Sequence, residues 1–414
     1  MFAVKTFKET SYWNVLNFIS ITVLCILMSA PLLLVPQHNA IQNSEYWYEI
    51  IVAIQFSNTL VTTLVTMMEC KILFNQKVFM SLRTFGFVYG TFVMSQLLFV
   101  LSYYVVFVVY LHYNPPMPFS GMVIPPSYYM SLAALWFSLP HDKRVENEQR
   151  KQYKVYIGYK ILNHTVLSIS HYLLSTIVKK MSQDLQWVIA FGLPISREIY
   201  TWLRRKLLHV AFEETRLNVV ELIKTNMNYA SDISITLATF ATKETGYVLL
   251  SVDFVMNIWT AITISRNDRK INPKLVSEDK LTKNIHRSLS ELALVEIIEF
   301  VVPMSYIVTL VIAMYGPNAS IIGNYGNGYW NFRPIGRLDK HLLAASKMFS
   351  VDCCSFVLGS FILWMFCFIN FSRKICQQLQ KYWLFIALSM SQGLVVVSVF
   401  YVIRYHRNEF DIKV

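Results

Sequence analysis

Two glutamates within an apolar stretch are the residues whose types and spacing best suit chemistry. Glu296 and Glu299 stand three residues apart, and Pro303 follows one turn later. Residues at this spacing are neighbours on one face of a helix. Two adjacent carboxylates that are shielded from water can share a proton or bind a cation. We therefore predict that this pair handles ions or protons.

Two further groups of charge fall within apolar stretches. One contains Lys243, Glu244 and Asp253, and the other is Arg197, close behind Pro194. A charge at the centre of a membrane-spanning helix costs about 2.5–3.5 kcal/mol on insertion scales, so it normally faces a protein interior or a water-filled cavity. We include these four charged residues in the ion-handling hypothesis.

Two structural alternatives are open at this stage. In the first, Lys243 or Arg197 pairs permanently with a glutamate and only fixes the register of the helices. In the second, residues 289–299 are the cytosolic approach to a span that begins near residue 298. The ion-handling hypothesis requires Glu296 and Glu299 to lie inside the membrane-spanning part of the helix.

The elements that would position these residues follow from the composition. Charged residues make up 15% of the 414 residues and hydrophobic residues 55%, whereas ordinary soluble domains are about 25% charged. Long runs contain no Asp, Glu, Lys or Arg, and many have the length of about 20 residues that a helical span needs. We therefore predict an all-α, polytopic helical membrane protein with about 8–10 transmembrane segments.

The predicted segments belong to a single multi-span membrane domain that covers residues 1–414. They lie near residues 13–36, 47–69, 86–112, 119–139, 156–178, 185–203, 233–264, 289–316, 349–371 and 382–404.

The distribution of Lys and Arg predicts the orientation in the membrane. The connections 142–160 and 266–287 are strongly basic, whereas 37–48 and 113–118 contain no Lys or Arg. Cytosolic loops carry the excess of Lys and Arg, so we expect a cytosolic N-terminus in either the plasma membrane or an endomembrane. On this orientation 317–345 lies outside, where Asn318 is a candidate glycosylation site.

The net charge of +12 does not indicate a nucleic-acid partner, because the basic residues sit in short connections between spans. Membrane orientation and attraction to anionic lipids on the cytosolic face account for them. The expected partners are the lipid bilayer and an unknown small molecule or ion, and the sequence is compatible with an oligomer.

Two segments depart from the pattern of simple spans. Three segments lie between the two basic connections, which is an odd number, so we expect one of them, 233–264, to be re-entrant or broken. Residues 204–231 instead show apolar side chains at helical spacing between charged ones. We expect an amphipathic helix there, lying on the inner membrane face or packed on a cytosolic bundle, with partner binding as the alternative.

Motifs that would identify an enzyme are missing from the sequence. There is no phosphate-binding loop, dinucleotide fingerprint, HExxH or GxSxG pattern. We expect no cofactor, no metal and no catalytic residue.

Three blocks of sequence carry a resemblance. The blocks 193–198, 241–254 and 315–330 resemble a family of uncharacterised eukaryotic multi-pass membrane proteins, over roughly residues 188–372. The resemblance implies a multi-span helical fold and no particular activity or site.

Three classes of function fit these features. A channel or ion-coupled transporter is favoured by the charges within apolar stretches and by the interrupted segment 233–264, since broken helices often build substrate sites. A chemosensory or signalling receptor for a small molecule is the alternative, favoured by the aromatic content of 15%. A membrane-embedded enzyme or a structural component is the third class.

Overall fold

All the regular structure in the described part of the chain is helical. The computed structural model describes residues 16, 19–27, 47–111, 124–180, 192, 199–200, 202–213, 217, 219–220, 244–270, 278–315, 336–367, 371, 375, 377, 380 and 382–391. No strand occurs among these residues, so the all-α prediction is confirmed for them.

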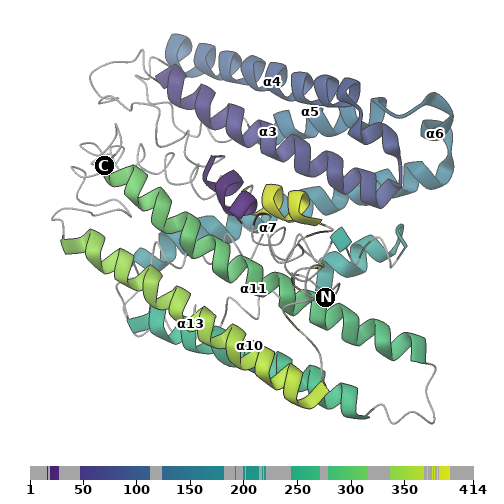
Figure 1. Ribbon diagram of the computed structural model, residues 1–414. Coiled ribbons are helices and arrows are strands. Elements are labelled where there is room, and N and C mark those ends of the chain that lie inside the picture. Colours follow the sequence, from purple (N-terminus) through teal and green to yellow (C-terminus); the bar gives the residue numbers. More distant parts are fainter. Residues whose placement is uncertain are drawn as a thin grey trace.

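The first group of helices begins with α3 (Trp47–Phe74), which a short 3₁₀ turn, η2 (Lys77–Met80), joins to α4 (Leu82–Tyr104). Asn75 adopts a left-handed backbone conformation with φ of 53°, which asparagine tolerates better than most residues. The chain reverses there, and α3 and α4 lie side by side (Figure 1). The Ser81 hydroxyl then caps α4 by accepting the N–H of Thr84 at 3.1 Å.

A π-helical turn, η3 (Val105–Tyr110), continues α4, and α5 (Ile124–Phe137) packs back against α4. Pro125 and Pro126 occupy the first turn of α5, where a missing N–H costs no helical hydrogen bond.

The basic connection 142–160 is mostly helical rather than an open loop. It forms α6 (His141–Val145) and the first part of α7 (Asn147–Lys180). Arg150, Lys151 and Lys154 are exposed, as expected of a cytosolic connection, but Lys160 is buried with only 2% of its surface exposed. Counting Lys160 among the loop cations was therefore wrong.

The second group contains α10 (Glu244–Lys270), α11 (Glu278–Tyr315) and α13 (Gly336–Cys367), which run alongside one another (Figure 1). Helix α10 is continuous from Glu244 onwards, so neither Gly246 nor Asp253 interrupts it. The part of the predicted broken segment before residue 244 lies outside the described residues.

The segment predicted as one amphipathic helix over 204–231 has a turn inside it and is helical again at the described residues 217, 219 and 220, while 214–216, 218 and 221–231 lie outside the described residues. The first helical part covers residues 202–209 and ends in a turn at Val210 and Ala211. Leu208, Phe212, Leu217 and Val220 are nevertheless buried, and they share one apolar cluster with residues of α3, α5 and α7. The described apolar positions thus pack on neighbouring helices, and their location on the cytosolic side stays a prediction.

The two ends of the described chain meet beside α3. The Cys25 thiol donates to the Ala387 carbonyl at 3.7 Å. Val61 and Val65 of α3 share a buried cluster with Phe385 and with other residues of the same region. The first and last helical pieces therefore close the bundle on one side of α3.

Two described helices are long and apolar enough to cross a membrane, judged by length and composition. They are Leu82–Ser102 and Ser346–Met365, which overlap the spans predicted near 86–112 and 349–371. A shorter apolar helix, Tyr382–Ser391, lies in the span predicted near 382–404, of which 392–404 is outside the described residues. The larger number of spans stays a prediction.

Candidate functional site

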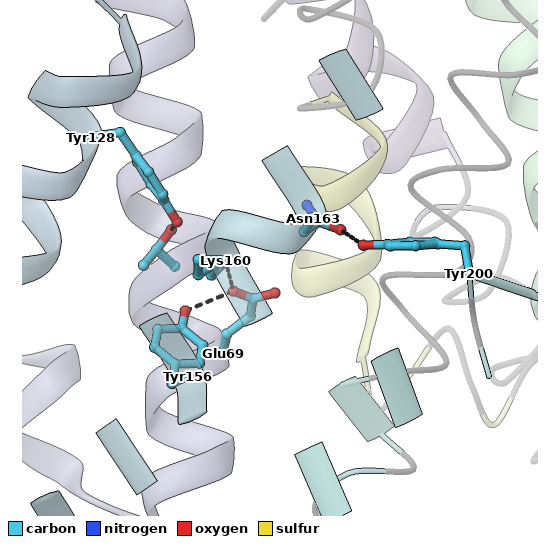
Figure 2. A network of polar contacts seen from close by, with 7 residues as sticks. Glu69, Tyr128, Tyr156, Lys160, Asn163 and Tyr200 are labelled. Carbon is cyan, nitrogen blue, oxygen red and sulfur yellow. Dashed lines mark hydrogen bonds and ion pairs between the residues drawn. The ribbon is translucent and has the colours of Figure 1, made fainter. Parts of the chain in front are cut away.

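A buried ion pair joins α3 to α7. The ammonium group of Lys160 and the hydroxyl of Tyr156, the latter at 2.9 Å, both donate to Oε2 of Glu69 (Figure 2). Glu69 and Tyr156 have no exposed surface, and Lys160 has 2%. The charges of the pair compensate each other away from water, which is the condition for burying them.

Three tyrosine rings surround the same ammonium group. The Lys160 Nζ lies 5.9 Å from the ring centre of Tyr128, 5.2 Å from that of Tyr156 and 5.6 Å from that of Tyr159. The face of an aromatic ring attracts a cation within about 6 Å of its centre. The lysine thus has a carboxylate and three ring faces around it.

Further polar contacts extend this group, which we call the α3–α7 polar cluster. The Tyr200 hydroxyl donates to Oδ1 of Asn163. The guanidinium of Arg204, a fully buried residue, lies 5.6 Å from the Tyr200 ring centre. Figure 2 shows that Asn163 and Lys160 come from the same helix, so the contact ties the segment around residue 200 to α7. The cluster therefore joins four separate parts of the chain, namely α3, α5, α7 and the segment around residue 200.

The α3–α7 polar cluster was missed at the sequence level. Glu69 follows directly after a charge-free run and Lys160 directly precedes another. Both positions look like the water-facing ends of spans. The repeated spacing of Tyr153, Tyr156 and Tyr159 around Lys160 was the available signal, because residues three apart line one helix face.

A second polar group lies between α10, α11 and α13, and we call it the carboxylate layer. It contains Glu296 and Glu299 of α11, which are 1% and 0% exposed, and Asp352 of α13, which is 4% exposed. The Asn257 amide of α10 donates to both oxygens of Glu299, at 3.0 and 2.9 Å. An uncharged group thus provides both of these contacts to Glu299.

Aromatic contacts show which face of α13 meets the glutamate helix. Phe300 of α11 packs edge-on against Phe349 and Phe356, with ring centres 5.5 and 5.9 Å apart. Asp352 lies between these two phenylalanines along the helix, on the face they share. The carboxylate of Asp352 is therefore on the side of α13 that faces α11.

The structure describes only some of the residues predicted to handle ions. Glu296 and Glu299 are together in the carboxylate layer. Glu244 and Asp253 are backbone positions of α10, and the structure does not describe their side chains. Lys243 and Arg197, the proposed static partners, and the candidate glycosylation site Asn318 lie outside the described residues. Asn257 and Asp352 were not predicted.

Residues 289–299, the proposed cytosolic approach, lie within helix α11. Leu289, Leu292 and Ala293 of this stretch share a buried cluster with α10 and α13. The segment is thus part of a packed three-helix core.

Neither group of polar residues has the form of a multidentate metal centre. Among the described residues, no three His, Cys, Asp or Glu side chains are arranged to hold a metal ion. Comparisons of the chain with protein-family models, curated proteins and solved structures find no match. The two buried polar groups are therefore the basis for a function.

Proposed function

We propose that this chain is a polytopic membrane protein that works as a channel or ion-coupled transporter, with Glu299 as an ion- or proton-handling group. The observation that carries the proposal is the pairing of the fully buried Glu299 carboxylate with the uncharged amide of Asn257. A buried carboxylate is costly unless a proton or a cation neutralises it. A neutral amide donates to the carboxylate without fixing its charge, so this group can exchange a proton for a cation.

Its neighbours support this role for Glu299. Glu296 is one turn away on the same helix, and Asp352 faces α11 from α13. Negative charges that are close together raise each other's affinity for protons and cations. In the α3–α7 polar cluster, the ammonium of Lys160 fixes the charge of the Glu69 carboxylate. The carboxylate layer is the better candidate for transport.

Exposed apolar stripes support the membrane location. On α4, Phe87, Met94, Leu98 and Leu101 are each at least half exposed and recur at helical spacing. Val357, Phe361 and Trp364 form a similar stripe on α13. Such stripes are costly in water and suit contact with lipid. The exposed basic residues near the start of α7 fit anionic lipids of the cytosolic face.

The test is ion flux through the full chain reconstituted in liposomes. Replacing Glu299 with glutamine keeps the size of the side chain but removes its charge. We expect H⁺ or Na⁺ flux to fall at least about tenfold, a loss of roughly 1.4 kcal/mol in the rate-limiting step. The free energy of unfolding should fall by only about 1 kcal/mol, because one hydrogen bond from Asn257 is lost.

A matched control is Glu291→Gln on the same helix. Glu291 is 44% exposed and lies 3.7 Å from Arg205, so this change should leave the flux unaltered. If Glu299→Gln lowers stability strongly and Lys243→Met restores it, Glu299 belongs to a static ion pair. Normal flux and normal stability together would refute both roles, and an absence of flux in the unaltered protein would favour the receptor.

The proposed orientation predicts which connections an outside reagent can reach. A cysteine in place of Leu275, in the basic connection 266–287, should not react with a membrane-impermeant thiol reagent in intact cells. A cysteine in place of Ser44, in the connection 37–48 that has no Lys or Arg, should react. The parent protein measures the background from its own cysteines. Labelling at 275 without labelling at 44 would reverse the orientation.

A further inference from the structure

We infer that the carboxylate layer is a binding site for a dehydrated monovalent cation, Na⁺, formed by Glu299, Asn257 and Ser355 between α10, α11 and α13. This inference rests on the proposed function and specifies the ion, with Na⁺ rather than a proton as the species bound. Na⁺ is a hard cation and prefers oxygen ligands, which carboxylate, amide and hydroxyl groups all provide.

Ser355 is the observation that points to a ligand. It is 1% exposed, and its hydroxyl oxygen has no hydrogen-bond partner among the described residues. Two other serines in these helices, Ser265 and Ser350, donate to the carbonyl four residues earlier at 2.9 and 2.8 Å. The Ser360 hydroxyl of α13 also has no partner among the described residues. A buried hydroxyl without a partner costs about 1–3 kcal/mol, and a bound cation would remove that cost.

The packing of α10 on α13 places Ser355 beside Asn257. A methyl group added at Gly359 would lie 4.0 Å from the Ala261 side chain, so Gly359 and Ala261 lie opposite each other at the same height along the packed helices. Ile264 and Ile362, further along the two helices, belong to one buried cluster, and Figure 1 shows α10 and α13 running in the same direction. Ser355 precedes Gly359 by one turn and Asn257 precedes Ala261 by one turn. Ser355 and Asn257 therefore lie opposite each other one helical turn earlier, at the height where Asn257 donates to Glu299.

The amide of Asn257 lies where a cation would bind the carboxylate. Its nitrogen is 3.0 Å from one oxygen of Glu299 and 2.9 Å from the other, which is the position between the oxygens that a bidentate cation takes. Rotation of the amide would turn its oxygen toward the carboxylate. That arrangement is repulsive unless a cation lies between them, so binding of Na⁺ and rotation of Asn257 are coupled.

The number of charges at the site favours a monovalent ion. The proposed ligands include one carboxylate and two neutral groups, and the described residues contain no trio of His, Cys, Asp or Glu side chains arranged for a metal ion. Ca²⁺ sites in proteins usually have more carboxylate ligands than this, and Mg²⁺ usually keeps several waters, which a dehydrated site does not hold. Glu296 and Asp352 add negative charge around the site without being required as ligands.

The experiment measures the melting temperature of the purified full-length protein in NaCl, in KCl and in N-methyl-D-glucamine chloride at one ionic strength. A ligand that binds only the folded state raises the melting temperature. We expect NaCl to raise it above the value in N-methyl-D-glucamine chloride, with a smaller effect of KCl. The Na⁺-dependent shift should disappear in Glu299→Gln.

The decisive variant is Ser355→Ala. Without Na⁺ it should melt at a higher temperature than the parent, because a buried hydroxyl without a partner is removed. With Na⁺ the advantage should shrink or reverse, and the apparent Na⁺ affinity should fall about tenfold. Ser350→Ala is the control, because this exposed serine already donates to the Ser346 carbonyl.

Equal shifts by NaCl in the parent, Ser355→Ala and Glu299→Gln would overturn the inference, as would no difference between the three salts. These failures are distinct from failure of the proposed function. Proton flux that depends on Glu299, without any Na⁺ effect on melting, would keep the transporter and reject the Na⁺ site. Na⁺-dependent melting without any flux would keep the site and reject transport.

Discussion

Replacing Lys160 with methionine should lower the free energy of unfolding by about 3–5 kcal/mol, because it leaves the carboxylate of Glu69 without its ammonium partner. The loss comes mainly from the uncompensated charge, since methionine keeps most of the volume of the side chain. Thermal or chemical unfolding of the purified protein measures the effect.

The double variant Glu69→Gln with Lys160→Met should recover most of this loss. Neither position carries a charge in this double variant, and the glutamine at position 69 can still accept a hydrogen bond from the Tyr156 hydroxyl. Lys143→Met is the matched control, since Lys143 pairs with Glu146 at 3.3 Å with both side chains over 40% exposed. Such surface pairs contribute about 0–1 kcal/mol. If Lys160→Met has no larger effect than the control, Glu69 and Lys160 are not a buried pair.

Phe74→Ala should be the other strongly destabilising substitution, at about 3–5 kcal/mol. The Phe74 ring is 3% exposed and packs edge-on against Phe79, Tyr156 and Phe212, with ring centres 5.7, 5.8 and 5.4 Å away. Its removal leaves a cavity at the place where the segment around residue 212 meets α3 and α7. Unfolding experiments measure the loss, and limited proteolysis after Arg205 or Lys206 should become faster.

Leu82→Ala is the control for Phe74→Ala. Leu82 is also apolar and lies at the start of α4, but it is 84% exposed. Substitutions at such surface positions usually change stability by no more than about 0.5 kcal/mol. Faster cleavage in Phe74→Ala without a loss of global stability would mean that Phe74 holds only the 202–213 segment.

The sequence by itself determined the helical class and the position of the acidic pair. Low charge and long apolar runs predicted helices, and the helices lie where the runs are, as for the spans near 86–112 and 349–371. Glu296 and Glu299 were identifiable because their spacing puts them on one face of one helix. These features are local, so a periodic reading of the chain suffices to find them.

Helix ends were predicted less well than helices. The helix expected over 204–231 is interrupted by a turn at residues 210–211, although Leu208, Phe212, Leu217 and Val220 are buried as their spacing suggests. The expected break in 233–264 is not seen after Glu244. Local polarity does not decide whether a helix ends, because a charged or glycine position inside a bundle can be stabilised by neighbouring helices.

Only the tertiary structure decided which polar residues meet. Glu69 and Lys160 are 91 residues apart, and Asn257 and Glu299 are 42 apart. Helical periodicity assigns each side chain to a face, but the order and direction of packed helices determine which faces come together. A lysine at the end of a span can also extend to water as easily as turn inward. Lys160 turns inward because Glu69 and three tyrosines surround its ammonium group. Glu69 comes from α3 and Tyr128 from α5, whereas Tyr156 and Tyr159 precede Lys160 on α7.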